Sequence, residues 1–296
     1  MAGHNEKKAA KTTGAVFLTA GIYLFWLLLS LVLKEESAIL ERGVVLETAV
    51  LIIPTVFWCV LRGEEQGGRL RIAFFSPAKT VFLLLFTAAM LCAALIAGIL
   101  TGSGSAETAL GVSLSGENSL LAALCLAVVP AAAEELFFRG LLLSELEDAG
   151  AGTSVLLSSL FFAMFHFSLS GLPLTFFCGV LLALCVYVTR SLLASVAIHI
   201  AYNLIALFGA RQFASFLSIT DSPLLPAALL GVVLLLCLIL IAGECQRTYA
   251  AYALQNDLAQ KKAPRGGASA FLSTLFSPAS AACIIIFILA LFIRNS

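Results

Sequence analysis

Charged residues are scarce in this chain. Only 11% of its 296 residues are Asp, Glu, Lys or Arg, whereas 61% are hydrophobic, and soluble domains carry about 25% charged residues. So few charges predict a polytopic membrane protein rather than a soluble domain. Basic and acidic residues number 17 each, so no basic surface indicates a nucleic-acid partner.

Common signatures of metal and nucleophile chemistry are also missing. The sequence contains no HExxH pattern, which removes the usual helical zinc signature. Its eight cysteines are scattered without a CxxC pair, so we predict neither disulfides nor a cysteine-rich metal site. The three aspartates (Asp148, Asp221 and Asp257) lie between the apolar runs, which excludes a pair of intramembrane aspartates. No GxSG-type serine turn lies in a run, so no local pattern supports a serine nucleophile.

Long apolar runs make up most of the chain, and runs of this length predict membrane-spanning helices. They lie at roughly 15–33, 44–61, 79–100, 119–143, 153–169, 173–189, 191–209, 223–243 and 279–293. The last run is short for a span and follows Pro278, so the prediction is an all-α transmembrane bundle of eight to nine spanning helices. Soluble domains and internal repeats are not predicted.

The distribution of Lys and Arg predicts the orientation of the chain in the membrane. With the N-terminus inside, the inner segments are 1–14, 62–78, 144–152, 190 and 244–270. Counting Lys79 at an edge, they carry twelve of the seventeen basic residues, against four in the outer segments. The N-terminus is therefore predicted to be cytoplasmic.

The same pattern divides the chain into four parts. They are a cytoplasmic tail (1–14), N-terminal transmembrane helices (15–118), a transmembrane core that contains the polar motifs (119–209), and C-terminal transmembrane helices (210–296) with the cytoplasmic loop 244–270. The core is the part expected to carry chemistry, because ionisable residues occur there inside apolar runs.

Three of these charges, Glu134, Glu135 and Arg139, lie within the fourth run. A charge at the centre of a membrane helix costs about 2.5–3.5 kcal/mol on insertion scales, so such residues are paired, hydrated or functional. Glu135 and Arg139 are four residues apart and share a helical face, which allows them to pair. Glu134 is rotated by about 100° and has no cation of its own, which suits a general base or acid. An isolated intramembrane glutamate serves packing or an ion pathway equally well.

Two of the three histidines lie in later apolar runs. Phe162 and His166 share one helical face, and His199 and Asn203 share another. An imidazole and an amide that donate toward one point would hold an oxyanion. Alone, His166 is as well explained by a bond to a backbone carbonyl, and the other pair by an interhelical clamp. Together with the glutamates, these residues predict one catalytic site between the helices.

The ordered motifs EExxxR, FxxxH and HxxxN resemble those of the CPBP family, which comprises type II CAAX prenyl endopeptidases and bacteriocin-processing or immunity relatives. The resemblance covers about 119–209 and implies an intramembrane endopeptidase with a catalytic cavity between helices. It implies that Glu134 activates water with help from His166, and that His199 and Asn203 stabilise the oxyanion. Glu135, Arg139 and Phe162 are then supporting residues.

Two histidines and a glutamate would also match a His₂Glu zinc set with an open water position. Its ligands would be Glu134, His166 and His199. Because HExxH is missing and His199 matches an oxyanion role, water attack without a metal is the favoured hypothesis. No cofactor is therefore predicted, and zinc is the alternative.

The resemblance implies a membrane-bound peptide or protein substrate within the lipid bilayer. This would be a prenylated C-terminus in the endoplasmic reticulum membrane of a eukaryote, or a leader peptide in the cell membrane of a bacterium. Two other hypotheses stay open: a catalytically silent immunity or binding protein on the same scaffold, and a transporter with a polar relay. Against the transporter, the sequence has no paired halves with matching broken spans.

Overall fold

The computed structural model describes residues 2–32, 48–63, 70–75, 79–101, 119–217, 222–254 and 268–295. All regular structure in these ranges is helical, with π-helical segments η1, η3 and η4 and a short 3₁₀ segment η5. In chain order the elements are α1 (Ala2–Val32), η1 (Thr48–Ile52), α3 (Ile53–Arg62), α5 (Thr80–Thr101), α7 (Ser119–Ala123), η3 (Leu124–Val128), α8 (Val129–Glu135), η4 (Leu136–Leu142), α9 (Leu143–Leu146), η5 (Glu147–Ala149), α10 (Ala151–Phe165), α11 (Leu172–Thr189), α12 (Leu192–Leu217), α13 (Leu224–Leu254), α14 (Ala268–Leu275) and α15 (Pro278–Asn295).

Within the described ranges, five helices are each long and apolar enough to cross a membrane. They are Thr12–Leu31, Thr80–Thr101, Leu172–Thr189, Leu192–Gly209 and Leu224–Thr248. A sixth crossing results if α14 and α15, which meet at a bend of 58°, count as one span. These helices coincide with predicted apolar runs, which confirms an integral membrane protein built as an all-α, multi-pass bundle.

The remaining predicted spans take other forms. The run 44–61 is matched by the shorter apolar helix Ala49–Arg62, and the run 153–169 by Ala151–Phe165. The run 119–143 is a series of consecutive helical segments from α7 to α9. The number of crossings, predicted as eight to nine, therefore stays a prediction.

Several helix boundaries differ from those read off the sequence. Helix α1 already begins at Ala2, so the described part of the predicted N-terminal tail is helical. Helix α13 continues to Leu254, and the first part of the predicted loop 244–270 is therefore helix, while residues 255–267 lie outside the described ranges. Helix α10 ends at Phe165, four residues before the predicted end at 169. Hydropathy marks the apolar stretch, but hydrogen bonding and packing decide where a helix ends.

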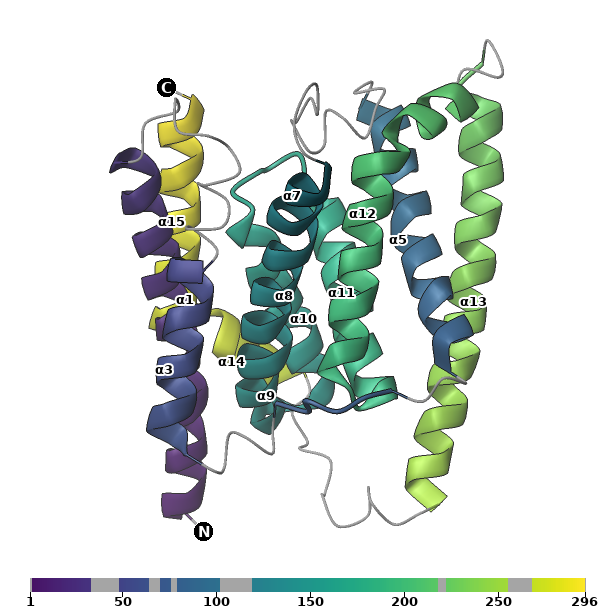
Figure 1. Ribbon diagram of the computed structural model, residues 1–296. Helices are drawn as coiled ribbons and strands as arrows, with labels where there is room; N and C mark the ends of the chain where they lie inside the picture. The colour runs from purple at the N-terminus through teal and green to yellow at the C-terminus, as the bar shows by residue number, and fades with distance from the viewer. Residues whose placement is uncertain are drawn as a thin grey trace.

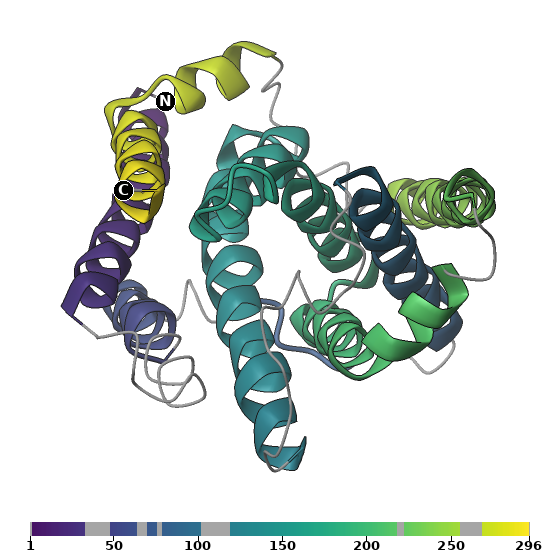
Figure 2. The same cartoon turned by 90° about the horizontal axis from the view of Figure 1, so that it is seen from above.

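The helices stand side by side, and the elements that carry the three motifs lie in the middle. Figure 1 shows α1, α3 and α15 on one side of α8 and α10, with α5 and α13 on the opposite side next to α12. The view from above in Figure 2 has the same order. The central elements are therefore covered on both sides by helices from outside the predicted core.

Of three hydrophobic clusters among the described residues, the two larger ones join helices from both sides of the bundle. One joins α1, η4, α10 and α15 through buried residues that include Tyr23, Phe138 and Phe287. The other joins α5, α11, α12 and α13 through residues that include Phe86 and Ile198. Because η4 and α10 contribute to the first cluster and α12 to the second, the motifs meet where the two clusters adjoin.

The start of α12 is held by the segment 70–75, which passes below the central helices in Figure 1. The backbone N–H of Leu192 donates to the Arg71 carbonyl at 2.9 Å. The Ser191 hydroxyl donates to the Ala73 carbonyl. These bonds satisfy backbone groups near the turn between α11 and α12, and they fix the end of the helix that carries the HxxxN motif.

Helices α10 and α11 approach each other closely at Gly179. A Cβ added to Gly179 would lie 3.0 Å from the Ser159 Cβ and 3.2 Å from the Phe162 Cδ1. Small residues at helix interfaces allow such backbone approach in membrane proteins. The glycine therefore sets the distance between the helix of the FxxxH motif and its neighbour.

Gly179→Ala is expected to lower the free energy of unfolding by about 1–3 kcal/mol, because the added methyl group overpacks this interface. Gly231→Ala is the matched control, since a Cβ at Gly231 in α13 would meet no atom within 4 Å. Thermal unfolding of both purified variants in detergent measures the difference. Equal melting temperatures for the two variants would contradict this account of the interface.

Candidate active site

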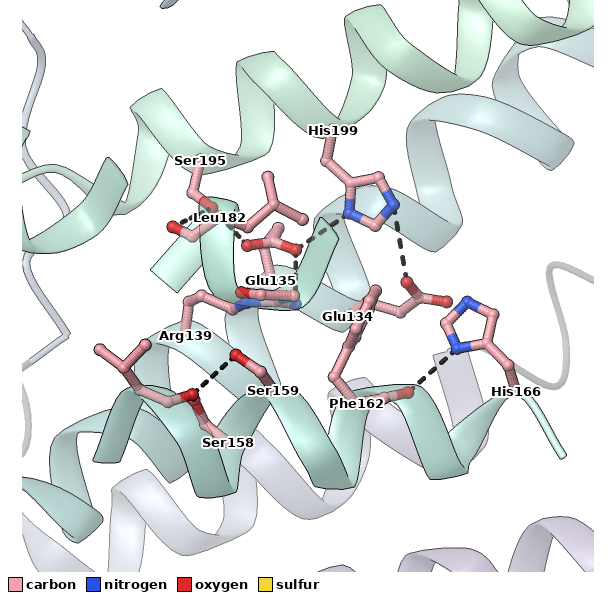
Figure 3. Close-up of polar contacts among 12 residues, drawn as sticks. Glu134, Glu135, Arg139, Ser158, Ser159, Phe162, His166, Leu182, Ser195 and His199 are labelled. Carbon is pink, nitrogen blue, oxygen red and sulfur yellow. Dashed lines mark hydrogen bonds and ion pairs between the residues drawn. The ribbon is translucent and has the colours of Figure 1, made fainter. Parts of the chain in front are cut away.

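Glu134, His166 and His199, three of the four residues predicted to carry chemistry, come together from three parts of the chain (Figure 3). Glu134 is contributed by α8 and His199 by α12, and the two residues are only 7% and 6% exposed. Asn203, also on α12, is partly buried, and His166 directly after α10 is exposed. The site thus has a buried interior formed by α8 and α12 and an exposed edge at the end of α10.

The helical series that carries both glutamates is not a regular α-helix. The π-helical segment η3 ends just before α8, whose first turn contains Pro130, and η4 begins directly after Glu135. Proline has no backbone N–H and interrupts the normal ladder of the helix, and π-helical turns frequently occur at functional sites. In the sequence, Pro130 is the residue that indicates this irregularity, and regular helical spacing does not take it into account.

Glu135 and Arg139 form the ion pair that their spacing predicts. The Arg139 Nη1 donates to the Glu135 Oε1 at 2.8 Å, and both side chains are fully buried. The Arg139 Nη2 donates to the Gly179 carbonyl at 3.3 Å, and its guanidinium lies 4.0 Å from the centre of the Phe162 ring. A single arginine therefore links the glutamate helix to both α10 and α11, by an ion pair, a hydrogen bond and a cation–π contact.

Glu135 also binds two residues of α12. Its Oε1 lies 2.9 Å from the His199 Nδ1, and its Oε2 accepts a hydrogen bond of 2.5 Å from the Ser195 hydroxyl. Helical spacing within the sequence did not predict the contact of Glu135 with His199 or its contact with Ser195. The available signal for Ser195 was its position four residues before His199, on the same helical face. The Ser195 hydroxyl therefore helps to hold the Glu135 carboxylate beside His199.

The contact with Glu135 determines which nitrogen of His199 carries the proton. A carboxylate paired with an arginine only accepts hydrogen bonds, so Nδ1 must be the donor. In a neutral ring the Nε2 then carries a lone pair, and this nitrogen lies 3.8 Å from the Glu134 Oε2. Glu135 thus orients the imidazole so that its Nε2 faces Glu134.

His166 directly follows the last residue of α10. Its Nδ1 lies 3.0 Å from the Phe162 carbonyl, which only accepts, so the Nδ1 is the donor here too. Figure 3 shows the other ring nitrogen turned toward the Glu134 carboxylate. The Phe162 ring contacts both imidazoles, with centroid distances of 4.9 Å to His166 and 5.9 Å to His199. Phe162 therefore supports the two rings from one side.

Its spacing suggested that Asn203 acts beside His199, but the contact that the structure shows is with the backbone of η3. The Asn203 Nδ2 donates to the Ala127 carbonyl of η3 over 3.5 Å. One N–H of the Asn203 amide is therefore directed at a backbone carbonyl of the glutamate helix.

The proposed zinc ligands do not form a metal site in this arrangement. Within the part of the chain that the structure describes, no three His, Cys, Asp or Glu side chains are grouped so that they could hold a metal ion. Glu134, His166 and His199 all lie in that part.

Comparison with known proteins gives one match. Residues 116–205 match the family model described as Rce1-like, the type II CAAX prenyl endopeptidase Rce1-like family. No curated protein and no solved structure matches the chain. The matched segment contains all three motifs and extends from the start of the glutamate helix into α12. Over residues 116–205 the chain is therefore similar to the type II CAAX prenyl endopeptidase Rce1-like family, in agreement with the CPBP resemblance of its three motifs.

Proposed function

We propose that the protein is an endopeptidase that hydrolyses a peptide bond of a membrane-bound peptide or protein inside the membrane. The observation that carries the proposal is the buried Glu134 carboxylate, which lies beside the Nε2 of His199 while Glu135 binds the other nitrogen of that ring. The family match supports this class of reaction. The specific roles of the residues are inferred from the contacts described above.

Glu134 acts as the general base in this proposal. It takes a proton from a water molecule as the water oxygen bonds to the carbonyl carbon of the peptide. The His166 Nε2 carries a lone pair and orients this water by accepting a hydrogen bond from its second proton. Proton transfer by a positioned carboxylate typically contributes about 10²- to 10⁴-fold to the rate.

His199 and Asn203 stabilise the oxyanion that forms in this step. His199 acts in its protonated form, because only then does its Nε2 donate while Nδ1 stays bonded to Glu135. The Asn203 amide supplies the second donor by leaving the Ala127 carbonyl, to which it is bonded over a long 3.5 Å. Glu134 then gives its proton to the departing nitrogen as the carbon–nitrogen bond breaks, which regenerates the carboxylate.

Glu135, Arg139 and Phe162 hold these groups in place without taking part in bond changes. Glu135 sets the tautomer of His199, and Arg139 keeps Glu135 ionised in a buried position. The Phe162 ring lies between the Arg139 guanidinium and the two imidazoles.

The depth of the site restricts the substrate. Glu134 lies twelve residues before Leu146, the end of α9, which corresponds to roughly 18 Å at 1.5 Å per residue. We therefore propose a substrate whose scissile bond reaches into the membrane, such as a prenylated CAAX-type C-terminus or a membrane-anchored leader peptide. With the N-terminus in the cytoplasm, the substrate enters from the cytoplasmic side.

Purified protein in proteoliposomes tests the function and the mechanism together. We expect cleavage of a farnesylated CAAX peptide or a membrane-anchored leader peptide, and no cleavage of the same peptide without its anchor. Exhaustive chelation should change the rate by less than about twofold, because side chains and water supply the general base and the oxyanion donors. A zinc peptidase assayed in parallel confirms that the chelator works.

Two outcomes would contradict the proposal in different ways. Activity that chelation abolishes and added zinc restores would establish the metal-dependent alternative. Binding of the anchored peptides without cleavage of either would indicate the silent binding or immunity protein.

A further inference from the structure

The residue after His166 has an unusual backbone conformation. Phe167 has a φ of +46°, in the left-handed region that residues with bulky side chains rarely adopt. Its N–H donates to the Met164 carbonyl at 3.0 Å, and the His166 N–H donates to the Ala163 carbonyl at 3.3 Å. These bonds tighten the last turn of α10 and end the helix, which the sequence pattern would have continued to residue 169.

Aromatic rings from helices outside the predicted core segment 119–209 hold Phe167 in this conformation. Phe167 is only 2% exposed. The Trp26 ring of α1 stacks on it at a centroid distance of 4.6 Å and an angle of 17°, and the Tyr23 ring meets it edge-on at 5.5 Å. Phe287 of α15 lies on it at 6.3 Å. Such contacts add to the stabilisation that burial alone supplies.

Helix α1 also binds the backbone of α10 directly. The hydroxyl of Tyr23, a fully buried residue, donates to the Phe161 carbonyl. Phe161 lies one helical turn before Phe165, at which the helix ends. The backbone of His166 therefore lies between two points, Phe161 and Phe167, that α1 holds.

We propose that Tyr23 and Trp26 are positioning residues for His166 and act through Phe167. By holding Phe167 in the left-handed conformation, they end α10 at the point where the His166 ring turns toward Glu134. Both residues lie on α1, outside the segment 116–205 that matches the family. The inference rests on the proposed function, because it assigns His166 to the orientation of water. It gives the first transmembrane helix a role in catalysis.

The values of kcat and KM for variants of Trp26 distinguish the positioning of His166 from a general packing role. Trp26→Ala is expected to lower kcat for peptide cleavage about tenfold, with KM changed less than twofold, because small displacements of a positioned group cost this much. Trp26→Phe keeps a stacking ring and should recover most of the loss. Phe25→Ala is the matched control on the same helix, because Phe25 is 46% exposed, and it should leave kcat unchanged.

The decisive comparison is the effect of Trp26→Ala in the wild-type protein against its effect in the His166→Ala variant. If Trp26 acts through His166, Trp26→Ala should lower the residual activity of His166→Ala by less than about twofold, since coupled residues are not additive. The same fold-loss in both backgrounds would overturn the inference and assign Trp26 to packing alone.

A measurement that does not depend on activity distinguishes this inference from the proposed function. The chain has three histidines, so the signals of ¹³C-labelled histidine in the detergent-solubilised protein can be assigned with His4→Gln and His199→Gln. Trp26→Ala is expected to shift or broaden the His166 signal and to leave the His199 signal in place. An unchanged His166 signal overturns the inference. If Glu134→Gln cleaves as well as the wild type, the proposed function fails, and the histidine signals still decide the positioning.

Discussion

Glu134→Gln lowers kcat for peptide cleavage by about 10³- to 10⁴-fold, near the upper end of what general acid–base groups contribute. Glutamine has nearly the same shape as glutamate but takes no proton from water at neutral pH. The contact of Glu134 with the His199 Nε2 spans 3.8 Å, whereas the Arg139 Nη1 binds Glu135. The substitution therefore leaves the buried ion pair intact, and the protein should unfold at an unchanged temperature.

The measurement is the initial rate of cleavage in proteoliposomes, with thermal unfolding in detergent as the control for folding. Glu244→Gln is a matched substitution, because the Glu244 side chain is 40% exposed and lies 3.8 Å from the exposed Arg247. It should retain full activity. Cleavage by Glu134→Gln at more than a tenth of the wild-type rate would rule out Glu134 as the base.

Arg139→Met lowers the free energy of unfolding by about 3–5 kcal/mol, because it leaves one partner of a buried ion pair behind. Glu135 would then remain 0% exposed without the guanidinium that lies 2.8 Å away. The Gly179 carbonyl and the Phe162 ring would lose a donor and a cation at the same time. The loss should therefore exceed that of any single surface ion pair.

Adding Glu135→Gln to Arg139→Met removes the unpaired charge and should restore part of the stability, since breaking such a pair costs more than replacing both partners. Arg247→Met is the control, because the Arg247 side chain is 84% exposed and exposed pairs contribute little. Unfolding in detergent followed by circular dichroism compares the three variants. Equal stability of Arg139→Met and Arg247→Met would show that the buried pair does not support the fold.

The sequence by itself determined the features that depend on local spacing or on composition. Apolar runs indicated the membrane helices, because a helix in lipid must satisfy its own backbone and present apolar side chains. The pairing of Glu135 with Arg139 followed from a separation of four residues on one helix. The three motifs together indicated the family, whose model matches residues 116–205.

Features that depend on how helices pack against each other came only from the tertiary structure. His199 was assigned to Asn203 from their shared face, but its Nδ1 binds Glu135, which lies 64 residues earlier in the chain. Ser195 joins the same carboxylate from 60 residues away. Helical spacing defines which residues share a face, whereas the rotation of each helix about its axis decides which partner that face meets.

The end of α10 is the clearest case. Residues 166–169 continue an apolar run, so composition gave no reason to stop the helix at Phe165. The structure stops it there, and Phe167 adopts its left-handed conformation in contact with Trp26, Tyr23 and Phe287. These rings lie more than a hundred positions away along the chain. Composition therefore marked the segment as apolar, and long-range packing determined where His166 points.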